Sequence, residues 1–164
     1  DIIDVSTGKG GNDINTGDGD DKATVGSNDF AFGGGGNDLV DASKGKGGNR
    51  IYGGDGGDTA IAGSKDELFG NEGDDTLEMK GGGNTAGGGA GKDKFVFDLT
   101  KGVPAEINKI LDFTSGEDKL DFKGISSNDV KYDQNTGIIS VNGNNLAELD
   151  GKPTINPTDD FEFM

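Results

Sequence analysis

The sequence predicts an all-β fold in which glycine- and aspartate-rich repeats precede a β-rich C-terminal segment. Residues 4–40 align with residues 41–77 without a gap, and 20 of the 37 pairs are identical, so the chain contains an internal duplication. Within each copy, turns of glycine and aspartate alternate with short apolar patches. After residue 93 glycine becomes rarer, and short alternating segments with β-branched residues replace the repeats.

The composition requires something besides a hydrophobic core to hold the chain together. Only 29% of the residues are hydrophobic, and the formal net charge is −16. Such a composition normally predicts disorder, because too little apolar surface is buried to offset chain entropy. Multivalent cations would cancel the charge that opposes compaction, and we therefore expect them to take part in folding.

Several functions are excluded by residues that the chain lacks. Without His and Cys it can build neither a zinc site nor a Ser-His-Asp or Cys-based catalytic centre, and we expect no enzyme activity. With a single arginine and an excess of acids we expect no nucleic-acid partner. We expect no membrane span either, since no apolar stretch approaches about 18 residues. The chain opens at Asp1 without a signal-like segment, which indicates a fragment or export through another signal.

Five nine-residue units share the pattern G-G-x-G-x-D followed by an apolar patch. They are TGDGDDKAT (16–24), which is the weakest, GGGGNDLVD (33–41), GGDGGDTAI (53–61), GNEGDDTLE (70–78) and GGAGKDKFV (88–96). The aspartates at position six, counting Asp1 as the first, are spaced 20, 17, 20, 17 and 18 residues apart. A flexible glycine linker needs neither this phase nor the apolar residues that follow.

These units resemble the nonapeptide of the RTX (repeats-in-toxin) calcium-binding family. The resemblance implies a parallel β-roll, a right-handed β-solenoid, over residues 1–97, with several Ca²⁺ ions between successive turns on one edge. It implies carboxylate ligands from Asp21, Asp38, Asp58, Asp75 and Asp93. It implies carbonyl ligands from Thr16, Asp18, Gly33, Gly35, Gly53, Asp55, Gly70, Glu72, Gly88 and Ala90. Ca²⁺ prefers such oxygen ligands, and five turns in a row would give four complete sites.

The opposite edge departs from the family pattern. Its aligned positions hold Asp13, Asp29, Arg50, Asp66 and Thr85. The three aspartates are weaker metal candidates, whereas the Arg50 cation would repel a neighbouring ion. Either Arg50 replaces the ion by pairing with Asp29 or Asp66, or the motif has simply decayed.

Residues 98–164 are expected to form a β-rich cap over the open end of the roll. The segment 129–141 predicts a hairpin with its turn at 133–137, and a further turn is expected at 142–143. Asp112, Asp118 and Asp121 either add a calcium site or are solvated acids. The final DDFEFM is similar to the C-terminal signals of proteins exported by type I secretion.

The resemblance implies a non-catalytic module of an extracellular protein, secreted or at the cell surface. Calcium would fold it after export through the type I machinery, and it would stabilise or position the upstream region of its parent. Two alternatives remain open at this point. One is a carbohydrate-binding accessory with a polysaccharide partner, like the repeat modules of the mannuronan epimerases, and the other is a repeat segment of an adhesin or surface-layer protein.

Overall fold

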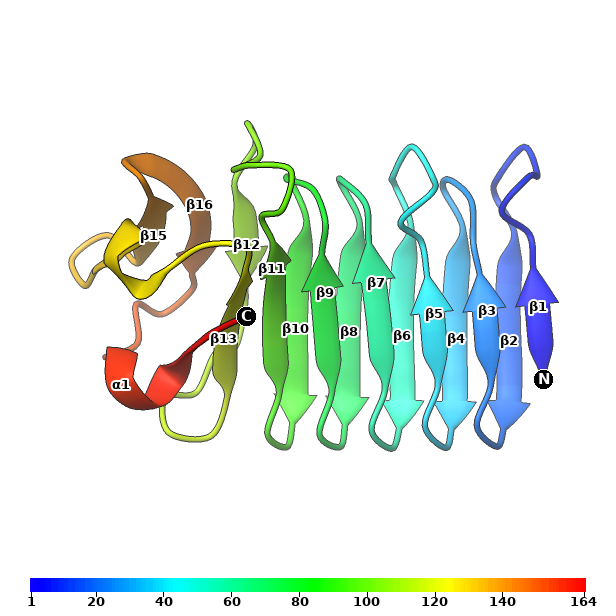
Figure 1. The fold of residues 1–164 in the computed structure, drawn as a ribbon. Coiled ribbons are helices and arrows are strands. Elements are labelled where there is room, and N and C mark those ends of the chain that lie inside the picture. Colours follow the sequence, from blue (N-terminus) through cyan, green and yellow to red (C-terminus); the bar gives the residue numbers. More distant parts are fainter.

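The computed structural model describes residues 1–164 as two facing β-sheets that run along one axis (Figure 1). Sheet A contains, in spatial order, β1 (Ile2–Asp4), β3 (Lys22–Thr24), β5 (Leu39–Asp41), β7 (Thr59–Ala62), β9 (Thr76–Met79), β11 (Lys94–Asp98), β13 (Lys119–Lys123) and β17 (Phe161–Phe163). Sheet B contains β14 (Val130–Asp133), β15 (Ile138–Val141), β16 (Asn144–Leu149), β12 (Asn108–Ile110), β10 (Thr85–Ala90), β8 (Glu67–Glu72), β6 (Arg50–Asp55), β4 (Phe30–Gly35) and β2 (Asp13–Asp18). Two short helices, η1 (Ser127–Asp129) and α1 (Pro157–Asp160), complete the chain.

From β1 to β13 the chain alternates between the sheets, so each of these strands pairs with the strand two places along in parallel register. Asp13, Phe30, Arg50, Glu67 and Thr85, for example, lie side by side across sheet B. The all-β solenoid, which has about five turns, is thus confirmed. Short turns form one edge, at the bottom of Figure 1, and longer loops form the other. We call these the first edge and the second edge.

The core is a single apolar row between the sheets, built from alternate residues of each strand. Sheet B contributes Ile14, Ala31, Ile51, Leu68, Ala86 and Ile110, and sheet A contributes Ala23, Val40, Ala60, Leu77, Phe95 and Leu120. All are at most 6% exposed. Toward the N-terminus each coil contributes an alanine to this row, namely Ala23, Ala31 and Ala60, so hydrophobic burial alone stabilises that part weakly.

Both sheets continue past residue 97, which lies inside β11, so the roll and the C-terminal segment share the same two sheets. β14 and β15 form the expected antiparallel hairpin, and a turn at Asn142 and Gly143 leads back into β16. β17 pairs in parallel with β13 at the end of sheet A. There Phe122 packs against Phe97, Phe161 and Phe163. None of the helices is long and apolar enough to cross a membrane.

Candidate calcium-binding edge

The first edge is formed by the five glycine-rich turns that lead from sheet B to sheet A. Gly54 and Gly56 adopt φ angles of 125° and 124°, a region that side chains disfavour. A Cβ on Gly54 would also lie 2.0 Å from the carbonyl oxygen of Gly34 in the preceding turn. Glycine is required here both by the backbone conformation and by the close stacking of the turns.

A continuous ladder of aspartates ties these turns together. The backbone N–H of each closing aspartate donates to Oδ1 of the closing aspartate in the next turn, at 2.7–3.0 Å. The rungs are Asp21, Asp38, Asp58, Asp75, Asp93 and Asp118. The structure therefore brings together all five carboxylates that the sequence singled out, and it adds Asp118 as the last rung.

The second carboxylate oxygen of four rungs has no partner. Oδ2 of Asp21, Asp38, Asp58 and Asp75 is buried and accepts no hydrogen bond. Burial raises the pKa of Asp38 and Asp58, and it raises the pKa of Asp75 and Asp93 to about 6. A buried, unpaired carboxylate oxygen is costly, so these four atoms are candidate ligands for a cation.

A backbone carbonyl of the next turn converges on three of these orphaned oxygens. A Cβ placed on Gly33 would lie 2.4 Å from Oδ2 of Asp38 and 2.5 Å from the carbonyl oxygen of Gly53. The same point on Gly53 lies 2.2 Å from Oδ2 of Asp58 and 2.7 Å from the Gly70 carbonyl. Glycine thus keeps open a space between a carboxylate and a carbonyl, and we call each such space a cradle. The third cradle, beside Gly70, joins Oδ2 of Asp75 and the Gly88 carbonyl.

The donor set of the cradles suits a hard cation. Carboxylate and carbonyl oxygens are the ligands that Ca²⁺ prefers, in loose geometry and with six to eight ligands. Nowhere does the structure gather three acidic side chains around one point, so backbone carbonyls would supply most of a shell. Among the expected carbonyls, those of Gly35, Asp55, Glu72 and Ala90 also accept an N–H from the preceding turn.

Side chains close the first edge at both ends. Thr16 occupies the place of the cradle glycine in the first turn, and its hydroxyl donates to the Gly33 carbonyl at 2.5 Å. At the other end, Asp112 accepts the N–H groups of Gly88 and Gly89 at 2.9 and 3.1 Å. Asp121 lies within β13, and the three acids considered for a cap site do not gather.

The expected alignment of the second edge is wrong by one residue at three positions. Asp13, Arg50 and Thr85 are the first residues of their strands and pair in register with Phe30 and Glu67. The turn positions beside Asp29 and Asp66 are instead filled by asparagines, namely Asn12, Asn49, Asn84 and Asn108. The repeated GKGGN at 8–12 and 45–49 ends at this asparagine and could have revealed it.

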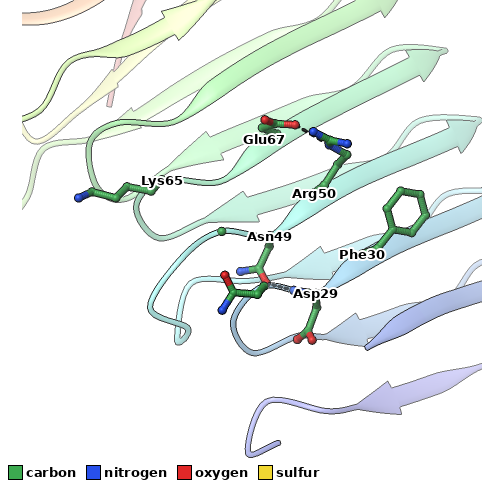
Figure 2. Close-up of a pocket in the computed structure, with 8 residues that line it drawn as sticks. Asp29, Phe30, Asn49, Arg50, Lys65 and Glu67 are labelled. Atoms are coloured by element: carbon green, nitrogen blue, oxygen red, sulfur yellow. Dashed lines mark hydrogen bonds and ion pairs between the residues drawn. The ribbon is translucent and has the colours of Figure 1, made fainter. Parts of the chain in front are cut away.

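Arg50 replaces no ion. Its Nε donates to Oε2 of Glu67 at 2.5 Å on the outer face of sheet B, and both side chains are largely exposed. Figure 2 shows Arg50 directed toward Glu67, while Asn49 lies next to Asp29. The expected pairing of Arg50 with Asp29 or Asp66 is therefore wrong, because Arg50 pairs with Glu67 and is not in the turn.

A stacked parallel roll with an edge of glycine turns and aspartates defines a class of repeat module. The family model described as "Peptidase M10 serralysin C terminal" matches residues 2–149. The chain therefore belongs to the serralysin C-terminal family, the non-catalytic RTX repeat region of those proteins. No curated protein matches the chain in sequence.

Proposed function

We propose that the first edge binds Ca²⁺ between successive turns and that this binding completes the folding of the roll. The observation that carries the proposal is the row of buried Oδ2 atoms without partners on Asp21, Asp38, Asp58 and Asp75. Each would be a ligand, together with carbonyls such as those of Gly53, Gly70 and Gly88. The ion supplies the positive charge that these oxygens lack.

The electrostatics of the ladder make metal binding and folding one process. Burial, and to a smaller extent repulsion between neighbouring aspartates, raises the pKa of Asp75 and Asp93, so charging these carboxylates is unfavourable in the folded roll. The chain as a whole carries a net charge of −16. A cation between turns removes this repulsion, and because the site does not exist in the unfolded chain, binding energy becomes folding energy.

The membership of the family supports a role in secretion. Extracellular calcium modules bind with dissociation constants of about 10⁻⁴–10⁻³ M, far above cytosolic free calcium. In the cytosol the module would remain extended, a state that suits passage through an exporter, and it would fold outside the cell. The acidic and apolar C-terminal segment would carry the type I signal, and the folded roll would stabilise or position the upstream part of the parent protein.

The test is a calcium titration of the full chain from chelator, followed by far-UV circular dichroism and light-scattering radius. We expect a cooperative gain of β-signal with compaction, absent when Mg²⁺ replaces Ca²⁺. The double variant Asp58→Asn/Asp75→Asn should shift the midpoint to higher calcium. A chain that is equally folded in chelator and in calcium would refute the proposal.

A further inference from the structure

The second edge also carries a ladder, but it is built from asparagines and aspartates that alternate as far as Asn84 and end with a further asparagine, Asn108. Each backbone N–H donates to the side-chain Oδ1 of the next turn, at 2.8–3.0 Å. The rungs are Asn12, Asp29, Asn49, Asp66, Asn84 and Asn108. Successive turns are thus joined by the same kind of hydrogen bond, from N–H to Oδ1, on both edges. The edges differ in the contacts of the second terminal side-chain atom, which is Oδ2 of an aspartate or Nδ2 of an asparagine.

On the second edge the carboxylates are satisfied within their own turns. Oδ2 of Asp29 accepts the N–H of Gly26 at 2.7 Å, and Oδ2 of Asp66 accepts the N–H of Gly63 at 3.1 Å. The corresponding oxygens of four first-edge aspartates have no partner. The short turns at 26–29 and 63–66 therefore supply a donor where the first edge leaves room for a cation.

The asparagines place a donor against the carbonyls that would otherwise face an ion. Nδ2 of Asn49 donates to the Gly26 carbonyl at 3.0 Å, and Nδ2 of Asn84 donates to the Gly63 carbonyl at 3.2 Å. The orientation of each amide is fixed, because its Oδ1 accepts a backbone N–H from the preceding turn. An N–H group cannot coordinate Ca²⁺, which binds oxygen.

We infer that Asn49 and Asn84 take the place of calcium, so that the second edge is closed by hydrogen bonds and Ca²⁺ is confined to the first edge. Asp29 and Asp66 each accept an N–H of their own turn. Asn49 and Asn84 each donate to a carbonyl of the preceding second-edge turn. The two outer asparagines differ, because Nδ2 of Asn108 is buried without a partner and Nδ2 of Asn12 donates to Oδ1 of Asp29. The exchange of ion for amide is therefore inferred for Asn49 and Asn84. The expected number of bound Ca²⁺ ions rests on the proposed function of the first edge, whereas the hydrogen-bonded ladder of the second edge does not depend on it.

The number of ions bound to the full chain at saturating calcium, measured by native mass spectrometry, tests the inference. Two double variants remove the same charge, Asp29→Asn/Asp66→Asn from the second edge and Asp58→Asn/Asp75→Asn from the first. We expect the first-edge variant to lose two ions and the second-edge variant to keep the wild-type number. Loss of ions from a folded second-edge variant would overturn the inference.

If an aspartate substitution prevents folding, the reverse change from asparagine to aspartate tests whether the second-edge amides exclude calcium. Asn49→Asp/Asn84→Asp removes the donors and places carboxylates side by side, whereas the control Asn135→Asp/Asn145→Asp adds the same charge at exposed cap positions. We expect the first variant to bind additional calcium, or to melt at a lower temperature than the control when calcium is scarce. If neither change occurs, amides do not replace the ion. A wild-type chain that binds no calcium would instead refute the proposed function. In that case a lower melting temperature of Asn49→Ala would still show that the second-edge hydrogen bonds of Asn49 stabilise the roll.

Discussion

Replacing Gly53 by alanine should remove one calcium site without changing any ligand. Gly53 has no positive φ, so alanine suits its backbone, but the added Cβ would lie 2.2 Å from Oδ2 of Asp58 and 2.7 Å from the Gly70 carbonyl. Overpacking of this kind costs about 1–3 kcal/mol. The loss of one ion should also lower the calcium dependence of the unfolding free energy by about 1.4 kcal/mol per tenfold change in calcium.

Urea unfolding at several calcium concentrations, followed by circular dichroism, measures both effects. The matched control is Gly35→Ala, which occupies a position where other turns carry Asp18, Asp55 or Glu72 and where the nearest atom is 3.6 Å away. The control should preserve the wild-type slope of unfolding free energy against the logarithm of calcium concentration. An unchanged slope for Gly53→Ala would show that the cradle beside Gly53 holds no ion.

Three further predictions concern charge and the cap. Because burial raises the pKa of Asp75 and Asp93 to about 6, the protonated carboxyls favour the folded state, and this contribution is lost as pH rises through about 6. The calcium-free chain should therefore show more β-signal at pH 4 than at pH 7, and a flat pH profile would contradict this. Asp75→Asn should raise the calcium midpoint more than Asp74→Asn, since Asp74 is exposed, and equal shifts would argue against the cradle. Phe122→Ala should cost about 3–5 kcal/mol in urea unfolding at every calcium concentration, because Phe122 is fully buried, and a calcium-dependent loss would refute a purely apolar role.

The first edge could be predicted because its repeats fix the stacking. The aspartates are spaced one coil apart, and a small or apolar residue such as Ala23 or Val40 lies two positions after each of them. Only one register of stacking therefore buries all of these small and apolar residues. The hairpin at β14 and β15 was accessible for a similar reason, since its alternation and its turn are local.

The second edge and the end of the cap required the structure. The second-edge turns differ in length, and although the repeated GKGGN ends at Asn12 and Asn49, the stacking is what places Asn49 rather than Arg50 in the ladder. The pairing of β17 with β13 joins residues about forty positions apart through three short strand residues, Phe161, Glu162 and Phe163. No local signal in such a short strand specifies a partner at that distance.

The connecting hydrogen bonds of both ladders point the same way, and this gives the two ends of the roll different needs. Each turn finds the acceptor for its closing N–H in the turn on its C-terminal side, so a turn without that neighbour leaves a donor unpaired. The last acceptor of the first edge, Asp118, is held by the N–H of Thr114 within its own loop and depends on no further turn. The cap therefore supplies the acceptor that the last coil of the roll needs, so that the closing N–H of Asp93 is satisfied without a further repeat.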